Sequence, residues 1–308
     1  KVLHRTRKKR GAIDFETVET EMVFNSQGKI EKICPVKRND AHRLIEDCML
    51  AANVCASDFL QKHQQPVLYR VHEGPSDEKL VALRDFLKEF GLQLRGGDKP
   101  RARDYARILD RIRERTDAQL LQTVMLRSLS QAMYSPDNAG HFGLAYEMYT
   151  HFTSPIRRYP DLLVHRAIKA VLAGKRYDPG DWHEIGKHCS QTERRADEAT
   201  REVESWLKCF YMQDKINDCF DGVITGVTAF GLFVTLDAVY VEGLVYISEL
   251  PSDYFRHDAA KHVLRGERSG ISFRLGDSLR VKLVRVDLAT RKIDFVLAED
   301  NVRRKSGR

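Results

Sequence analysis

HFTSPIRRYPDLLVH, at residues 151–165, is the stretch that decides most about this chain, because it places two arginines beside a predicted helix start. Ser154 is a favourable N-cap and Pro155 a favourable first helical residue, so Arg157 and Arg158 are predicted to lie in the first turn. The helix dipole and the free N–H groups of a first turn attract anions and disfavour guanidinium groups. We therefore expect an anion here, and a phosphate held by arginine forks would satisfy these donors together.

Two features of the same stretch complicate this interpretation. Asp161 lies four residues after Arg157 and three after Arg158, so a local salt bridge is the alternative to a bound anion. Pro160 falls inside the predicted helix and is expected to kink it or to confine α-geometry to one side.

The first two thirds of the chain are predicted to be largely helical. Residues 12–36 alternate loosely around Gln27-Gly28 and predict a hairpin, after which Asn39 or Asp40 can cap a long helix. Further helices are predicted at about 77–91, 102–114, 117–132, 155–173 and 181–215. The basic stretches at 4–10 and 302–308 are short enough to be solvated tails, with contact to a nucleic-acid backbone as the alternative.

The sequence pattern changes near Asp218. Beyond it, the segments FDGVITGVTAFGLFVTL, YVEGLVYISEL, SLRVKLVRVDL and KIDFVLAE alternate with a period of two, as half-buried strands do. They resemble an S1-type OB-fold, a five-stranded barrel whose exposed face binds single-stranded nucleic acid. The fold class predicted for the whole chain is therefore α+β.

Composition is compatible with a partner that is a polyanion. The 308 residues carry a net charge of +7 with a pI near 9.0. The six cysteines show no C-x-x-C spacing, which favours reduced core thiols over a disulfide or zinc framework. Reduced thiols indicate a cytoplasmic protein. The sequence contains no signal peptide and no apolar run of about 18 residues, so a membrane is not indicated.

Extended back to His141, the opening stretch becomes HFGLAYEMYTHFTSPIRRYPDLLVH, which resembles the signature of the RNB exoribonucleases, the family of bacterial ribonucleases II and R. The segments RNDAHRLIEDCMLAAN at 38–53 and LLQTVMLRSLSQAMY at 120–134 agree with it. The resemblance covers essentially the whole chain and is strongest to the ribonuclease R branch. It implies that residues 1–217 are the distal part of the catalytic domain, 218–299 an S1-type RNA-binding domain and 300–308 a basic tail.

The family resemblance implies a processive 3′ to 5′ exoribonuclease. Such enzymes hydrolyse single-stranded RNA to nucleoside 5′-monophosphates with magnesium, and structured RNA is a further candidate substrate. The family holds its metal ions in an aspartate cluster ending in D-x-D-D, and this chain contains no two aspartates separated by one residue.

The expected ligands for Mg²⁺ therefore lie in an upstream segment. Because the chain starts at Lys1, we expect that segment to be missing, to act as a partner, and to be needed for activity. The alternatives are a non-catalytic module or pseudoenzyme that binds single-stranded RNA and, with little support, a helical interaction scaffold.

The resemblance also assigns roles to residues of the catalytic part. Arg157 is the candidate catalytic arginine that contacts the scissile phosphate, and Arg158 is the second candidate. Glu46 matches an acidic position that contacts the ribose of the terminal nucleotide, where a carboxylate can accept from the 2′-OH. The alternative for Glu46 is a surface helix glutamate near Arg43, and the adjacent Asp47 competes for the same role.

Two further positions are implied less specifically. Phe15 resembles a phenylalanine against which the stacked 3′ bases end, and a core position is its alternative. An acidic family position precedes Trp206, and three glutamates of that segment could match it: Glu198, Glu202 and Glu204.

On the barrel, the resemblance implies an RNA-binding face. Phe230, Phe233, Asp287 and Arg291 match the family pattern, and Tyr246 stands where the family has a histidine, which keeps stacking and loses the imidazole. An odd spacing sends side chains to opposite faces of a regular strand, so both phenylalanines can share a face only through the kink expected at the glycine between them. The alternative is that one of the two belongs to the core.

Overall fold

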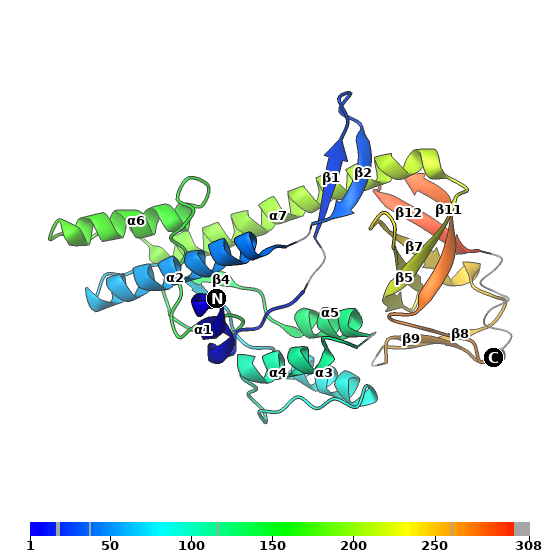
Figure 1. The fold of residues 1–308 in the computed structure, drawn as a ribbon, viewed down its shortest axis with the longest axis horizontal. Helices are drawn as coiled ribbons and strands as arrows, with labels where there is room; N and C mark the ends of the chain where they lie inside the picture. The colour runs from blue at the N-terminus through cyan, green and yellow to red at the C-terminus, as the bar shows by residue number, and fades with distance from the viewer. Residues whose placement is uncertain (17–18, 37, 116, 260, 299–308) are drawn as a thin grey trace. The chain divides into compact units, whose positions relative to one another are not determined.

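The computed structural model describes residues 1–16, 19–36, 38–115, 117–259 and 261–298. The chain forms two compact units (Figure 1). The first consists of Lys1–Phe15 with Arg38–Asp197, and the second of Glu16–Lys37 with Glu198–Arg308. The predicted tail at 300–308 and the basic stretch at 302–308 lie outside the described residues, and the predicted division at 217/218 stays a prediction.

The first unit is helical, as the sequence pattern predicts. Its helices are α1 (Val2–Arg10), α2 (Asp40–Lys62), α3 (Asp77–Glu89), α4 (Ala102–Ile112), α5 (Ala118–Ser128), α6 (Tyr159–Leu172) and the first part of α7 (Trp182–Met212). Two short strands, β3 (Tyr69–Val71) and β4 (Met133–Ser135), pair antiparallel. The side chain of Asn39 accepts hydrogen bonds from the N–H groups of Ala41 and His42 and so caps α2.

Helix α1 corrects one sequence prediction. Residues 4–10, predicted to be a solvated tail, form most of a helix that ends at Gly11, whose φ of 87° is left-handed. None of its residues is buried, so the apolar periodicity that predicts helices is missing. Ion pairs from Arg7 to Asp14, Glu46 and Asp47 hold this helix to its own unit instead.

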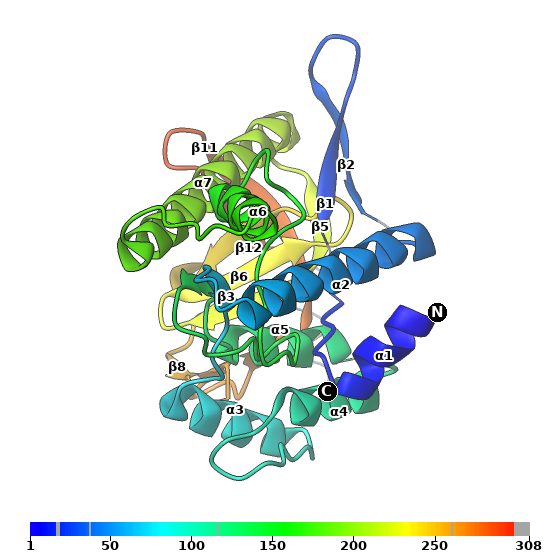
Figure 2. The same cartoon turned by 90° about the vertical axis from the view of Figure 1, so that its left-hand side faces the viewer.

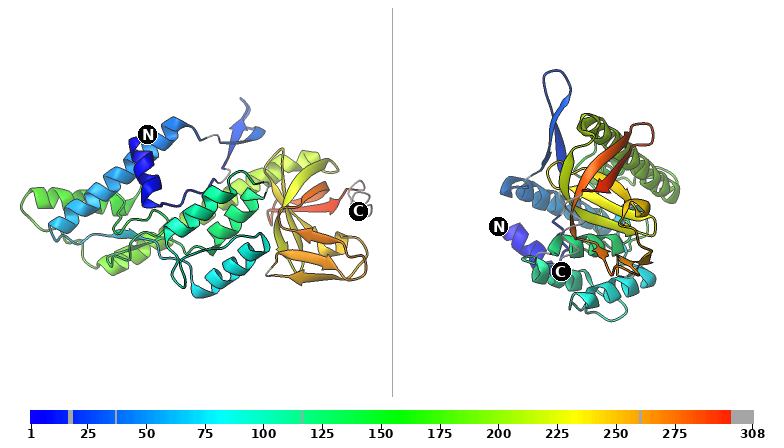
Figure 3. Two further views of the ribbon diagram at one scale, coloured as in Figure 1. Left: turned by 60° about the horizontal axis from the view of Figure 1, so that its bottom comes forward. Right: turned by 90° about the vertical axis from the view of Figure 1, so that its right-hand side faces the viewer.

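Among the described residues, three apolar clusters build the core of the first unit, and the third of them joins Leu68 and Leu163. Helices α3, α4 and α5 lie together (Figure 3). They meet around Leu87, Tyr105 and Leu121, each with no exposed surface. Helices α2 and α6 lie side by side and share a second cluster that includes Leu60 and Val164 (Figure 2). The second cluster fixes α6, and with it the segment that carries the two arginines.

The second unit confirms the predicted barrel. Within the described residues, β5 (Cys219–Thr228), β6 (Gly231–Leu236), β7 (Glu242–Tyr246), β11 (Ser278–Asp287) and β12 (Lys292–Leu297) close in the order β11-β12-β7-β6-β5 (Figure 3). The alternation that predicts strands is seen in β6, where Leu232, Val234 and Leu236 have no exposed surface. The short 3-10 helices η1 (Gln213–Lys215) and η2 (Ile247–Glu249) complete the connections.

Two further sheets belong to the second unit. The predicted hairpin is present as β1 (Thr20–Phe24) and β2 (Ile30–Pro35), paired antiparallel. A three-stranded antiparallel sheet of β8 (Phe255–Asp258), β9 (Val263–Gly266) and β10 (Ser272–Arg274) has no counterpart in the sequence-based expectation.

All six cysteines are free in the structure. The expectation that they are core thiols holds for Cys189 and Cys209, which are buried, whereas Cys48, Cys55 and Cys219 are exposed. Among the helices that the structure describes, none has both the length and the apolar character needed to cross a membrane.

Candidate RNA-binding sites

The two arginines of the opening stretch lie at the beginning of α6, but not as predicted. Residues 155–157 form a turn and the helix begins at Tyr159, which places Pro160 in the first helical turn. A proline there removes no intrahelical hydrogen bond, so the kink expected from Pro160 does not arise. Arg158 is the N-cap, and the predicted Ser154 cap is wrong.

Arg158 and Arg157 have different surroundings. The Nη2 of Arg158 donates to Oδ1 of Asp161 at 2.6 Å, and the backbone N–H of Ser154 donates to the same oxygen at 2.8 Å. The Asp161 side chain is fully buried and that of Arg158 is 19% exposed. The salt-bridge alternative is therefore confirmed for Arg158.

Arg157 is exposed, and its side chain forms no ion pair or hydrogen bond with any residue in the described part of the chain. The backbone N–H of Arg157 donates to the carbonyl of Ser154 at 3.3 Å. The backbone of the turn is therefore held in place, whereas the Arg157 side chain is not. The neighbouring Ile156 is also fully exposed, so the turn presents both side chains to solvent. A free guanidinium on a fixed turn is available to an anion.

A partly buried polar network lies near Arg158. The Tyr134 hydroxyl and Nδ1 of His151 are 2.9 Å apart, and Arg70 lies 4.6 Å from the centre of the Tyr134 ring while binding Glu193 at 2.6 Å. Burial, and then the nearby Arg158, lower the pKa of His151 to about 2, which keeps the imidazole neutral. Sequence reasoning missed Tyr134, although it ends the quoted segment 120–134, and it had no signal for Arg70 or Glu193.

Asn53 explains why the segment at 38–53 accompanies the arginine stretch. Its Nδ2 donates to the hydroxyl of Tyr149 at 2.8 Å, and its Oδ1 accepts the backbone N–H of Phe152 at 2.9 Å. Helix α2 thereby holds the segment at 149–152, which leads into the arginine turn.

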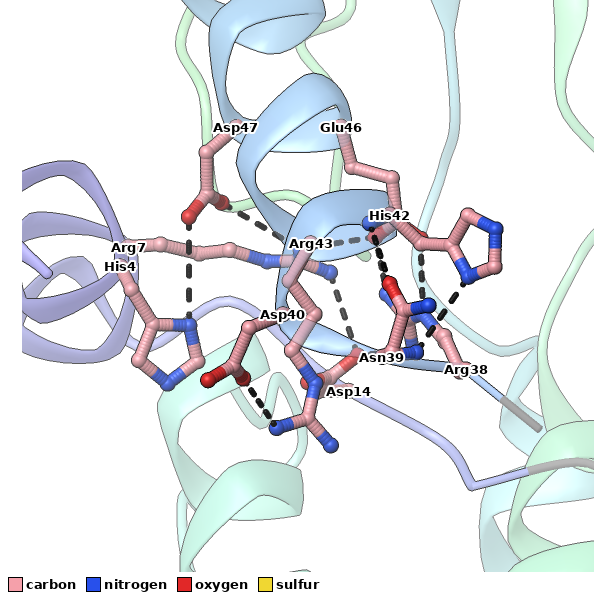
Figure 4. A network of polar contacts seen from close by, with 10 residues as sticks. All are labelled: His4, Arg7, Asp14, Arg38, Asn39, Asp40, His42, Arg43, Glu46 and Asp47. Carbon is pink, nitrogen blue, oxygen red and sulfur yellow. Dashed lines mark hydrogen bonds and ion pairs between the residues drawn. The ribbon is translucent and has the colours of Figure 1, made fainter.

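Glu46 lies in an ion-pair network between α1 and α2 (Figure 4). The Nε of Arg38 donates to its Oε1 at 2.7 Å, Arg38 also reaches its Oε2, and Arg7 lies 3.6 Å from that oxygen. These contacts, led by the hydrogen bonds from Arg38, lower the pKa of Glu46. Its partner is thus Arg38, not the expected Arg43, which pairs with Asp40 at 3.6 Å.

The competing Asp47 is 7% exposed and lies 3.6 Å from Arg7 and 4.0 Å from His4. Glu46 is the more accessible of the two, at 36%. Phe15 lies outside the hairpin and packs, partly buried, against the core of α3, α4 and α5. The structure therefore agrees with the core alternative for Phe15, and its stacking role stays a prediction.

On the barrel, the predicted aromatic residues line one pocket of about 780 Å³. Phe230 is 51% exposed, Tyr246 is 37% exposed and Phe233 is partly buried, so neither phenylalanine belongs to the buried core. The Phe230 and Phe233 rings are 6.0 Å apart and nearly perpendicular, at 87°. Arg291 lines the same pocket.

Gly231 brings the two rings together in a way that differs from the expected kink within a strand. Phe230 lies in the turn before β6, so strand alternation does not apply to it. A Cβ at Gly231 would lie 2.3 Å from the carbonyl oxygen of Val245, so the close approach of β6 and β7 requires glycine here.

Asp287 and Arg291 have separate roles at the end of β11. Oδ1 of Asp287 accepts the N–H groups of Ala289 and Thr290 at 3.0 and 3.1 Å, and these bonds, Thr290 first, lower the pKa of Asp287. Asp287 caps the turn and does not line the pocket. Of the three candidate glutamates before Trp206, Glu202 pairs with Arg291 at 3.2 Å and Glu204 lines the pocket. Glu198 does neither among the described contacts.

The described residues contain no group of three or more His, Cys, Asp or Glu side chains arranged to hold a metal ion. The carboxylates of Asp14, Glu46 and Asp47 each lie within ion-pair distance of an arginine. This donor set does not fit a site for two magnesium ions, which needs carboxylates converging on the metals.

Two family models together match most of the chain. A family model described as RNB domain matches residues 1–174, and one described as S1 RNA binding domain matches residues 213–297. Ribonuclease R of Vibrio cholerae is 52% identical, over 97% of this chain and 38% of the relative. Ribonuclease R of Escherichia coli is 49% identical, over 96% and 38% respectively. The chain thus spans about 38% of the length of these curated relatives.

Solved structures give the same relationship. RNase R of Mycoplasma genitalium, in its apo form, superimposes with a TM-score of 0.90 at 28% identity, over 96% of this chain and 48% of the other. The complex of that protein with ribose methylated single-stranded RNA gives the same values. Its complex with double-stranded RNA gives a TM-score of 0.80 at 26% identity, over 96% and 49%.

Proposed function

The chain belongs to the RNB family, and on that basis we propose that it is part of a hydrolytic exoribonuclease that degrades single-stranded RNA from the 3′ end to nucleoside 5′-monophosphates. The observation that carries the proposal is the unpaired, exposed Arg157 on a turn fixed by the buried Arg158–Asp161 pair. Structured RNA is a second substrate class, since the related Mycoplasma enzyme has been solved with double-stranded RNA.

Arg157 is proposed to contact the scissile phosphate. A guanidinium donates two parallel hydrogen bonds to phosphate oxygens and stabilises the negative charge that develops on them. Arg158 is held away from this role by Asp161, so it acts as a positioning residue for the turn.

The barrel pocket is proposed to hold the incoming strand. Phe230, Phe233 and Tyr246 offer aromatic surfaces, and Arg291 offers a cation beside them. Stacking contributes about 1–3 kcal/mol per base and tolerates any sequence, which suits an enzyme that moves along a strand.

The magnesium expected from the RNB resemblance is part of the proposal, with ligands outside these 308 residues. The carboxylates of the described residues do not fit such a site. The free cysteines are consistent with a reducing compartment, so a cytoplasmic location also belongs to the proposal.

The test compares the 308-residue chain with the protein as its native source makes it, using 5′-labelled single-stranded RNA and Mg²⁺. The expected result is that the native protein releases nucleoside 5′-monophosphates in order from the 3′ end, and that the 308-residue chain binds RNA without cleaving it. Binding without release by both would instead favour a non-catalytic RNA-binding module. A lack of RNA binding by both would contradict the proposal.

A further inference from the structure

The three-stranded sheet β8-β9-β10 exposes a row of arginines on one face. In the register of the sheet, Arg256 on β8 lies directly opposite Arg265 on β9, and Arg274 of β10 lies one pair further along. All three are exposed. The other face of this sheet carries the buried side chains of Phe255, Leu264 and Phe273 and the partly buried His257, so the arginine face is fixed toward solvent.

The side chains of these arginines lack the acidic partners that Arg285 and Arg291 of the same unit have in Asp287 and Glu202. No ion pair or hydrogen bond joins the side chain of Arg256, Arg265 or Arg274 to another described residue, although the backbone N–H of Arg274 donates to Oδ2 of Asp277 at 3.0 Å. Asp258 lies on the same face, but its Oδ1 accepts the backbone N–H of Lys261 at 3.1 Å and so closes the hairpin turn. Like charges directly opposite each other on a sheet destabilise it, so the Arg256/Arg265 pair has a cost that folding does not explain.

An exposed tyrosine extends the row. Tyr254 is 71% exposed and precedes Arg256 by two residues, which places both on one face of an extended chain. Its carbonyl accepts the N–H of Glu267 at 2.9 Å, so the pairing of β8 and β9 continues to this position. Proteins bind single-stranded RNA with aromatic rings that stack on bases and with cations that contact phosphates. An exposed tyrosine beside unpaired guanidinium groups offers both.

We propose that the face formed by Tyr254, Arg256, Arg265 and Arg274 is a second contact for single-stranded RNA, separate from the aromatic pocket of the barrel. This inference rests on the proposed function, because it assumes that RNA is the ligand. The residues that line the aromatic pocket and those of this face do not overlap. On this proposal a short oligonucleotide occupies the pocket alone, whereas a longer strand also contacts the arginine face.

The test measures RNA affinity against salt for two lengths, about 5 and about 20 nucleotides, since one OB-fold occupies about 4–16 nucleotides. The Arg256→Gln/Arg265→Gln variant should bind the longer RNA roughly tenfold more weakly at low salt, with a salt slope smaller by about 1.4, because each single-strand phosphate contact contributes about 0.7. Its affinity for the short RNA should stay unchanged. The matched control is Lys29→Gln/Lys32→Gln, which removes two exposed charges from the hairpin of the same unit.

Equal losses in the two variants would mean that only net charge matters, and would overturn the inference. So would wild-type affinity and slope in the arginine variant. Wild-type protein that binds neither RNA would contradict the proposed function as well, which separates the two failures.

A second variant guards against an effect on folding. Arg265→Glu places a carboxylate opposite Arg256 and should raise the melting temperature by about 2 °C while it weakens binding of the longer RNA. A variant that is more stable and binds long RNA as well as wild type would also overturn the inference. Retention on vesicles of anionic lipid that depends on these arginines, without any change in RNA binding, would assign the face to a membrane surface instead.

Discussion

Arg158 donates from Nη2 to the buried Oδ1 of Asp161 at 2.6 Å, and the same oxygen accepts the N–H of Ser154 at 2.8 Å. One carboxylate therefore ties together both ends of the turn at 155–157. It also lies in the first turn of α6, where negative charge is favoured by the helix dipole. The pair occupies Arg158 and leaves Arg157 as the exposed cation.

Asp161→Asn tests this relationship. The variant keeps an acceptor for Ser154 but leaves Arg158 mostly buried without a counter-ion, which should lower the free energy of unfolding by about 3–5 kcal/mol. Urea denaturation followed by circular dichroism measures the change. Arg157→Ala is the control and should stay within about 0.5 kcal/mol of wild type. Equal stability of the Asn variant and wild type would show that the pair does not hold the turn.

Arg157→Ala in the active native protein tests the catalytic assignment. Loss of a donor that stabilises developing charge should reduce kcat by about 10²–10³-fold, with a much smaller change in RNA affinity. Single-turnover hydrolysis and equilibrium binding separate the two effects. Arg157→Lys keeps the charge but not the fork, and should recover only part of the rate. Lost binding with unchanged turnover would contradict the assigned role.

Arg157 and Arg158 show which part of the site could be predicted from the sequence and which part could not. The spacing to Asp161 allows a salt bridge from either, and only tertiary burial selects Arg158. Local preference placed the helix start at Pro155, because Ser154 is a good N-cap in isolation. The carboxylate of Asp161 takes up the N–H of Ser154, and the helix starts later.

The parts of the fold that could be predicted are those with local signals. Helix α2 has its Asn39 cap, and the barrel strands alternate. Helix α1 has no apolar face, and long-range ion pairs from Arg7 fix it instead. Strands of three or four residues, as in β8 and β10, are too short for periodicity to show.

Phe230→Ala/Phe233→Ala tests the aromatic pocket. Each lost stacking surface should cost about 1–3 kcal/mol of binding free energy, so affinity for single-stranded RNA should fall by at least tenfold. Hydrolysis of very short oligonucleotides by the native protein should stay largely intact. Phe24→Ala removes an equally exposed ring from the hairpin and should leave RNA affinity unchanged. Wild-type affinity in the double variant would refute the platform.

The partly buried histidines His141 and His151 predict a dependence of stability on pH. Burial lowers the pKa of His151 to about 2 and that of His141 to about 3, so the folded state binds fewer protons than the unfolded state at mildly acidic pH. The free energy of unfolding is therefore fully present above about pH 6.5 and falls as the pH drops toward the folded values, by up to about 1.4 kcal/mol per pH unit for each histidine.

Urea denaturation at about pH 7.5 and about pH 5.5 measures this loss. His151→Gln keeps an acceptor for the Tyr134 hydroxyl and should reduce the difference between the two conditions. His188→Gln changes an exposed histidine of α7 and should leave the difference as in wild type. A slope unaffected by His151→Gln would show that this histidine is protonated equally in both states.

Glu46→Gln distinguishes the ribose contact from the ion pair with Arg38. The contact predicts that wild-type protein prefers a 3′-terminal ribonucleotide over a 2′-deoxynucleotide, because the carboxylate accepts from the 2′-OH. The amide of the variant should reduce that preference by about tenfold, the typical worth of a hydrogen bond to a charged group. Arg38→Gln removes the partner and keeps the carboxylate, so it should retain the preference for ribose. Competition between RNA substrates that differ only in the terminal sugar measures it. Loss of preference in Arg38→Gln but not in Glu46→Gln would assign Glu46 to the ion-pair network alone.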